Sequence, residues 1–342
     1  MPNCALVKNT VRIEDIIGQV VSLKCHGSWY QGRCPFHDDH HPSLVVWPAT
    51  QTWKCMTCSD QRDDVIGFIA RWRGCSIEDA LRYLSIDEPE PASLSKPAVP
   101  ASLPRASILD RHATYHALLT AWGLSARHAR ALRARGLGPA DIQRAEFASL
   151  IPGVAPVPPT APGIPGFAWR NDHWQILSRS GLAIPVRDVQ GRIQALHVRV
   201  DDPGSGGKYR WVSSPNAPQG AASGAPVHVA QGVPDVVWIT EGPLKAIVAQ
   251  SRLGHTVLGI PGVNAWATVL DILPVLHPQR VVIALDHDAQ PATAATVARH
   301  VTQLQTALTA AGWSVVTARW RSRKGLDDVL VAGVPVTLTP HR

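Results

Sequence analysis

Two short apolar runs in the stretch 235–288 each end in carboxylates, and this pattern constrains the fold more than any other feature of the chain. Glu241 follows VVWIT, and Asp286 and Asp288 follow RVVIAL. Short β-branched runs that alternate with helix-length segments are typical of buried strands in a parallel α/β sheet, whose sites lie beyond the carboxyl ends of the strands. We therefore predict that all three acids face one crevice.

Carboxylates clustered this tightly repel one another, so they need a cation, a proton or an arginine to coexist near neutral pH. A hard divalent cation is the natural partner. The alternative is that these acids are ordinary loop-capping or N-cap residues, because short motifs match by chance. The full order of strand, Glu, Gly and helix, then strand and Asp-x-Asp, is less generic. It resembles the TOPRIM domain of primases, type IA and II topoisomerases and related nucleases.

The length of 342 residues allows two or three domains, and the net charge of +7 favours an acidic partner such as nucleic acid. No N-terminal stretch combines a basic head with a long apolar run, and no segment approaches a membrane-spanning length. We therefore predict a cytoplasmic protein with no membrane partner. The six cysteines are too few and too unevenly placed for a disulfide scaffold.

Four cysteine and histidine residues are spaced as two ligand pairs. Cys34-x2-His37 and Cys55-x2-Cys58 are separated by residues 38–54, which is enough chain for a small hairpin. Two such pairs suit a tetrahedral zinc ion, and because protein fills all four positions we predict one structural Zn²⁺. The alternative is four reduced residues that merely lie near one another.

His40 and His41 lie close enough in sequence to compete with His37 as a ligand, and we interpret them as solvent-exposed loop residues instead. Alternating side chains predict the strands of the hairpin at 44–47 and 52–54. Helices are predicted over 11–21, from Asp64 to Arg73, and over 77–84, where Ser76 and Asp79 form a start like a capping box. The zinc-binding domain is therefore predicted to span 1–87.

The passage that begins CPFHDDHHPSL and ends at Leu84 is similar, nearly position by position, to the zinc-binding domain of bacterial replicative DNA primases. One departure is the sequence SDQR at 59–62, where that family often has a Gly-rich turn, and it concerns the shape of the loop more than the metal. The resemblance implies that this domain reads or clamps the template, with exposed aromatic residues such as Trp53 available for base stacking.

Residues 88–107 are rich in Pro, Ala and Ser and are predicted to be a linker. The segment 105–144 carries seven arginines in a helical pattern, and a solvated helix face is the alternative to a phosphate-contacting surface. Its segment ALRARGLGPADIQ resembles the start of the primase catalytic core, which favours contact with nucleic acid. We assign 108–234 to the basic N-terminal part of this core. The Pro-rich stretch 151–167 is expected to lack regular structure.

From Gly181 the sequence predicts a hairpin with its turn at Gln190-Gly191. This segment resembles the primase core just before TOPRIM, and the resemblance places four basic residues on the active-site positions of that family. They would hold template phosphates or the incoming triphosphate, although each alone is also explained as a surface residue. The four are Arg187, Arg192, Arg199 and Lys208.

The predicted TOPRIM domain, 235–342, continues with a long helix over 292–311, a strand in WSVVTARW, and the word KGLDD at the exit of that strand. Lys324, Asp327 and Asp328 are therefore expected on the metal and triphosphate side, with a helix N-cap as the alternative for Asp327. EGPLKA and KGLDD resemble the TOPRIM variants of primase-like proteins from plasmids, phages and integrative elements. Lys245 is then a candidate catalytic phosphate ligand, or simply an exposed helix lysine.

The resemblance covers roughly 11–87 and 108–330. It implies an α/β protein in which a small zinc-ribbon domain is joined by a linker to a basic helical element and a TOPRIM-type parallel sheet core. It also implies a primase-like nucleotidyltransferase that uses single-stranded DNA with NTPs or dNTPs, and a separately encoded replicative helicase as a partner. Two Mg²⁺ or Mn²⁺ ions would be held by Glu241, Asp286 and Asp288 for in-line displacement.

Two other functions are compatible with these residues. One is a TOPRIM metal-dependent nuclease or topoisomerase, although the four tyrosines and the short chain do not suit a type IA topoisomerase. The other is a non-catalytic, single-stranded-DNA-binding replication accessory, against which the presence of all three acids argues.

Overall fold

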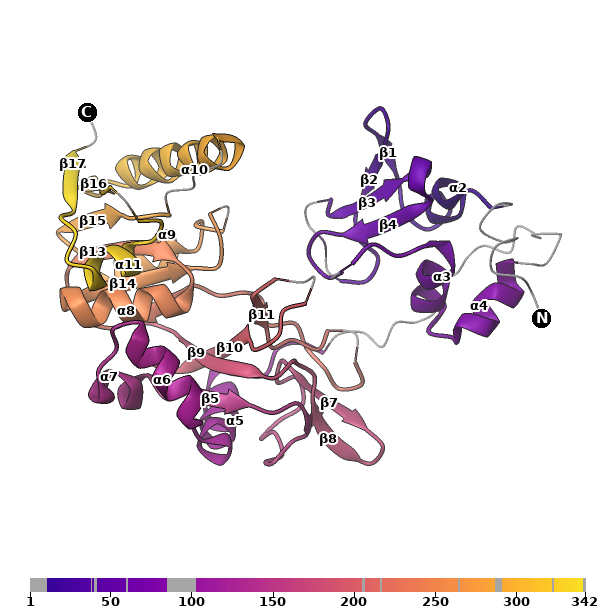
Figure 1. The fold of residues 1–342 in the computed structure, drawn as a ribbon, viewed down its shortest axis with the longest axis horizontal. Coiled ribbons are helices and arrows are strands. Elements are labelled where there is room, and N and C mark those ends of the chain that lie inside the picture. The colour runs from indigo at the N-terminus through magenta and orange to yellow at the C-terminus, as the bar shows by residue number, and fades with distance from the viewer. Residues whose placement is uncertain are drawn as a thin grey trace. The chain divides into compact units, whose positions relative to one another are not determined.

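The computed structural model describes residues 11–37, 39, 42–59, 61–84, 103–204, 207–215, 217–263, 265–286, 291–321 and 323–340, with the side chains of 291–296 left out. These residues form two compact units, which we describe separately (Figure 1). The first comprises 11–84 with positions 203, 204 and 207, and the second comprises the rest of 103–340. Mixed helices and sheets in both units confirm the predicted α/β class. No described helix is both long and apolar enough to cross a bilayer.

Over its described residues, the first unit has a four-stranded antiparallel sheet and three helices. The strands, in sheet order, are β1 (Lys24–Cys25), β2 (Tyr30–Gly32), β3 (Leu44–Trp47) and β4 (Thr52–Cys55). The helices are α2 (Ile13–Gly18), α3 (Val65–Arg73) and α4 (Ile77–Leu84), and a 3-10 turn, Pro48–Thr50, joins β3 to β4. The hairpin predicted at 44–47 and 52–54 is confirmed, as is the helix 77–84.

Local polar contacts explain where these helices begin. The Asp64 carboxylate accepts hydrogen bonds from the backbone N–H groups of Ile66 and Gly67 at 2.9 and 3.0 Å, which caps α3 as the sequence predicted. The helix predicted over 11–21 is shorter, because α2 ends at Gly18 and the chain turns there. Val21 is nevertheless buried in the core of the unit.

The second unit begins earlier than predicted. Leu103 donates to the Gly220 carbonyl and Ala106 to the Gly163 carbonyl, both at 3.0 Å, so the last residues of the predicted linker belong to the fold. The basic element is then divided into three helices, because Ser125 and Gly138 start new ones. They are α5 (Ile108–Trp122), α6 (Ala126–Ala134) and α7 (Pro139–Ala145).

Two antiparallel sheets follow these helices. One has the order β11-β10-β9-β5, with β5 (Ala148–Leu150), β9 (Gly181–Arg187), β10 (Ile193–Val200) and β11 (Tyr209–Trp211). The predicted hairpin from Gly181 is therefore confirmed. The other is β6 (Gly153–Val154), β8 (His173–Ile176) and β7 (Phe167–Arg170) in the order β6-β8-β7. Because β6 lies inside the Pro-rich stretch and β7 begins at its last residue, the expectation that 151–167 has no regular structure is wrong at Gly153, Val154 and Phe167.

A six-stranded sheet forms the rest of the unit, in the order β12-β14-β13-β15-β16-β17. Its four inner strands are parallel, and both edge strands are antiparallel. The strands are β12 (His228–Ala230), β13 (Val233–Glu241), β14 (His255–Ile260), β15 (Arg280–Ile283), β16 (Val315–Arg319) and β17 (Thr337–Pro340). The helices are α8 (Pro243–Leu253), α9 (Val269–Leu276), α10 (Pro291–Ala310) and α11 (Leu326–Val331). Since β12 precedes residue 235, this sheet starts before the predicted TOPRIM boundary.

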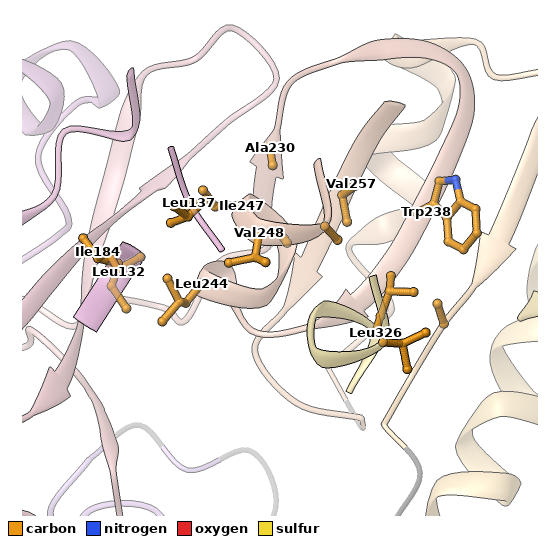
Figure 2. Close-up of a cluster of buried hydrophobic side chains, with 14 of the residues drawn as sticks. Leu132, Leu137, Ile184, Ala230, Trp238, Leu244, Ile247, Val248, Val257 and Leu326 are labelled. Carbon is orange, nitrogen blue, oxygen red and sulfur yellow. The ribbon is translucent and has the colours of Figure 1, made fainter. Parts of the chain in front are cut away.

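The central residues of the inner strands are buried and mostly apolar because both faces of the sheet are covered there. On one face, Trp238 and Val257 lie in a cluster with the apolar side of α8 and with Leu326 (Figure 2). Leu132 and Ile184 belong to the same cluster, which therefore joins the basic helices and the hairpin to the parallel sheet. On the other face, Val237 and Leu258 pack against α9 and α10. This double packing holds the carboxyl ends of β13 and β15 in a fixed position.

Candidate zinc cluster and acidic site

The two predicted ligand pairs meet in the first unit. Cys34 and His37 follow β2, while Cys55 ends β4 and Cys58 lies in the turn after it. One potential ligand atom from each of the four residues lies within 4.8 Å of the others, and the sulfurs of Cys34 and Cys58 are 3.6 Å apart. Zn–S bonds of about 2.3 Å in a tetrahedron require a sulfur separation of about 3.8 Å, so the arrangement fits zinc.

Neighbouring groups orient these ligands. The Cys55 sulfur accepts hydrogen bonds from the backbone N–H groups of Thr57 and Cys58 at 3.3 Å. One oxygen of Asp39 lies 3.5 Å from Nε2 of His37, which leaves Nδ1 facing the Cys55 sulfur at 3.9 Å. A carboxylate behind a metal-binding histidine is a common second layer of a zinc site. Hydrogen bonds from the His37 ring to the sulfurs of Cys55 and Cys58 raise the pKa of His37 to about 10, so the cluster favours positive charge.

Trp53 corrects one prediction made for this domain. Its side chain is only 1% exposed, it packs at a tilt against Phe36 and edge-to-face against Phe68, and its indole N–H donates to the Asp64 carbonyl at 3.0 Å. Trp53 is therefore a core residue that cannot stack on bases. His40 and His41, the alternative ligands, lie outside the described residues.

The second unit brings acids and a lysine together beyond the carboxyl ends of β13 and β15. Glu241 is the last residue of β13, and its carboxylate accepts a hydrogen bond from the backbone N–H of Asp286 at 3.3 Å. Lys245, in the first turn of α8, forms an ion pair with Oδ2 of Asp286. Asp327, in the first turn of α11, forms an ion pair with Arg135 at 3.3 Å. Asp288 lies outside the described residues, so its predicted place in the triad stays a prediction.

Two oxygen atoms in this site are buried without a hydrogen-bond partner among the described residues. They are Oδ1 of Asp286, a residue 6% exposed, and Oδ1 of Asp327, which is 3% exposed. Both face Gly325: a Cβ placed on this glycine would lie 3.3 Å from the Asp286 oxygen, 2.5 Å from the Asp327 oxygen and 3.4 Å from the Lys245 nitrogen. A side chain at 325 would fill this space, and two unpaired carboxylate oxygens around it are suitable ligands for a hard cation.

The electrostatics of the site agree with a missing positive charge. Burial raises the pKa of Glu241, and the charge of Asp286 raises it further. Burial likewise raises the pKa of Asp327, while the charge of Lys245 opposes that shift. Lys324 and Asp328, the other predicted residues here, are exposed, and their charges act on Glu241 and Asp327 respectively. A divalent cation would offset both the cost of burying these charges and the repulsion between them, and so would oppose the rise of these pKa values.

The four predicted basic residues have different surroundings. Arg187 forms an ion pair with Glu146 and donates to the Gly191 carbonyl at 2.8 Å, so it has a structural role. Arg192 pairs with Asp188 at 2.7 Å. Arg199 is half-buried and Lys208 is exposed, and neither has an ion pair within the described residues. The last two therefore remain the better candidates for phosphate contact.

Sequence reasoning did not single out Arg135, which pairs with Asp327 across the fold. The basic pattern of α6 was visible, but a contact between positions so far apart leaves no local signal. It also missed the ring cluster of His197, Tyr209 and Trp211 on β10 and β11. Tyr209 and Trp211 lie on β11, a strand that was not predicted, and their spacing was the available signal, because residues two apart in a strand share a face.

Comparison with known proteins agrees with this division into two parts. Residues 2–89 match the model of the CHC2 zinc finger family, and residues 229–335 match a domain of unknown function, DUF3854. The zinc-binding assignment of the first unit is therefore confirmed.

Curated relatives include the DNA primase of Listeria innocua, which is 26% identical over 239 residues, covering 62% of this chain and 37% of that protein. The DNA primase of Clostridium acetobutylicum is 37% identical over 79 residues, covering 23% of this chain and 13% of its own length. The Aquifex aeolicus primase structure, with zinc binding and RNA polymerase domains, aligns over 97% of this chain and 85% of its own, with 16% identity and a TM-score of 0.48. The chain thus spans 37% of the length of one of these curated relatives and 13% of the other, and the resemblance to bacterial DNA primases is confirmed.

Proposed function

We propose that this relative of bacterial DNA primases is itself a primase-like nucleotidyltransferase, which starts short primers on single-stranded DNA from NTPs or dNTPs. The observation that carries this proposal is the pair of buried, unpartnered oxygens of Asp286 and Asp327 around Gly325, beside Lys245. A buried carboxylate oxygen without a hydrogen bond is costly to folding, so two such oxygens in one place are best explained by a ligand that completes them.

Divalent Mg²⁺ or Mn²⁺ fits this oxygen set, and Glu241, Asp286 and Asp327 would hold it, joined by Asp288. When bound, such ions lower the charge on the triphosphate, activate the primer 3′-hydroxyl and stabilise the leaving pyrophosphate. Lys245 supplies a further positive charge at the same place, suited to a phosphate oxygen. Arg135 pairs with Asp327 and so orients its carboxylate towards Gly325.

A nuclease would use the same acids, and a non-catalytic accessory would use none of them. A labelled linear single strand, incubated with NTPs or dNTPs and Mn²⁺, separates the three functions. Primer synthesis gives new strands that are shorter than the template, and a nuclease shortens the labelled strand. A non-catalytic accessory makes no new strand and leaves the labelled strand at full length. We expect new strands. Shortening of the labelled strand without any synthesis would refute the proposal.

The basic helix α6 supports template binding, because it turns arginines outward. Arg130 and Arg133 are exposed, and no ion pair to either occurs within the described residues, whereas His128 and Leu132 point into the fold. We predict that Arg130→Glu with Arg133→Glu weakens single-stranded DNA binding. The slope of log K against log salt should become shallower by about 0.7 for each DNA phosphate that the protein no longer neutralises.

Fluorescence anisotropy at several salt concentrations measures this effect. The matched control is Arg299→Glu with Arg319→Glu, which makes the same charge change at exposed positions on α10 and β16. Equally weakened binding in both double variants would mean that only the net charge of the protein matters. An unchanged slope of log K against log salt in the α6 variant would mean that this helix is exposed to solvent and does not contact DNA.

Lys245 gives a separate prediction about the metal. Because its ammonium group is paired with Asp286, it competes with any cation for that carboxylate. Lys245→Met keeps the length of the side chain but removes the charge, so Mn²⁺ should bind several-fold more tightly. Titration followed by electron paramagnetic resonance measures the affinity. The control Lys24→Met removes an exposed charge in the first unit and should change nothing. An unchanged affinity in Lys245→Met would place the ion away from Asp286.

A further inference from the structure

The hairpin of β10 and β11 has two different faces. Leu196, Val198 and Val212 lie on one face and are buried in a hydrophobic cluster. The strand register pairs His197 with Trp211 and Arg199 with Tyr209, so these four side chains lie together on the opposite face. We call these four residues the ring face.

Three rings of this face are stacked. The His197 ring lies 4.5 Å from the Trp211 ring at an interplanar angle of 28°, and 5.3 Å from the Tyr209 ring at 23°. His197 is 9% exposed, whereas Tyr209 is 37% exposed and is among the large apolar side chains that the fold leaves open. Burial lowers the pKa of His197 to about 4, so its ring is uncharged at neutral pH. The stack of rings therefore ends in a solvent-accessible tyrosine, Tyr209, that lies against the uncharged ring of His197.

Positive charge lies beside these rings. Arg199 stands directly across from Tyr209 in the register, and the described residues provide no ion pair for its guanidinium group. Lys208, the residue before Tyr209, is exposed. An aromatic face next to unpaired cations is the combination that binds unstacked nucleotides, in which a base stacks on a ring and its phosphate contacts the cation.

We propose that the ring face is a base-stacking surface for single-stranded DNA, with a base on Tyr209 and the adjoining phosphates on Arg199 and Lys208. This inference rests on the proposed function, because it takes the template strand as the ligand. Stacking on Tyr209 adds a contribution to the free energy of DNA binding that does not depend on salt, since stacking does not release counterions.

Two variants and two oligonucleotides test the surface. Tyr209→Leu removes the ring, and Tyr209→Phe keeps it. With a dT oligonucleotide, Tyr209→Leu should bind about 5- to 100-fold more weakly than wild type, and Tyr209→Phe should stay within about twofold. The salt slope should be the same for all three proteins. With an abasic strand of equal length, wild type and Tyr209→Leu should bind equally, because no base is present to stack.

Photo-crosslinking of wild-type protein to a strand containing 5-iodo-deoxyuridine is a second measurement that needs no variant. The crosslinked peptide should contain Tyr209 or Trp211. Wild-type affinity of Tyr209→Leu for dT, equally weakened binding of the abasic strand, or crosslinks confined to other peptides would each overturn the ring face. If wild-type protein binds no single-stranded DNA, the proposed function itself fails. If wild-type protein and Tyr209→Leu bind single-stranded DNA equally well, only the ring face fails.

Discussion

Asp286→Asn should lower primer synthesis by about a thousandfold or more while leaving DNA binding intact. Asn has nearly the same size, but it lacks the negative charge that anchors a divalent ion beside Glu241 and Asp327. It also removes the partner of Lys245, so the ammonium group is no longer held. Synthesis is measured by nucleotide incorporation, and affinity by anisotropy, on the same preparation.

Asp271→Asn is the matched control, because it removes one carboxylate from an exposed position on α9. It should retain most of the synthesis. Since the acids act as one unit, Glu241→Gln added to Asp286→Asn should cost little more than either change alone. Wild-type synthesis in Asp286→Asn would remove this acid from the mechanism, and loss of DNA binding in a folded variant would point to an architectural role.

Cys55→Ala should release the zinc ion and unfold the first unit. The Cys55 sulfur is a ligand and also accepts two backbone hydrogen bonds, so the turn after β4 loses both supports. Structural zinc contributes about 10–16 kcal/mol of apparent binding free energy in small domains, which exceeds the stability of an ordinary domain of this size. The second unit is separately compact and should keep its melting transition.

Metal analysis should find about one zinc per wild-type chain and none in Cys55→Ala, and limited proteolysis should cut within 11–84 in the variant alone. Cys25→Ala is the control, because that cysteine is exposed and lies outside the cluster. Stoichiometric zinc in a variant lacking both Cys34 and Cys55 would contradict the assignment.

Local patterns were enough to predict much of this fold. The caps at Asp64 and Ser76 and the turn at Gln190-Gly191 depend on contacts within a few residues, and each is found where expected. The positions of Glu241 and Asp286 followed from a general property of parallel sheets rather than from any one contact.

The failures have physical reasons as well. Trp53 was taken as exposed, although the period of a strand places it on the same face as Cys55, which is buried. Arg187 pairs with Glu146, and such a pair made by tertiary folding leaves no mark in either local sequence. Its assignment as a phosphate ligand stays a prediction. The sequence did place Asp327 on the same side as Asp286, because KGLDD follows the exit of a strand. The meeting of the two carboxylates around Gly325 depends on the docking of α11, which no sequence window contains. The narrower relation to primase-like proteins of mobile elements stays a prediction.

The most direct test of primer synthesis uses a circular single-stranded DNA, which has no 3′ end to extend. Wild-type protein, carrying its zinc, is incubated with this circle, labelled NTPs or dNTPs, and Mn²⁺. We predict short labelled strands complementary to the circle, and none with Asp286→Asn. Binding of the circle without any labelled strand, or cleavage of the circle, would contradict the claim that this chain synthesises primers.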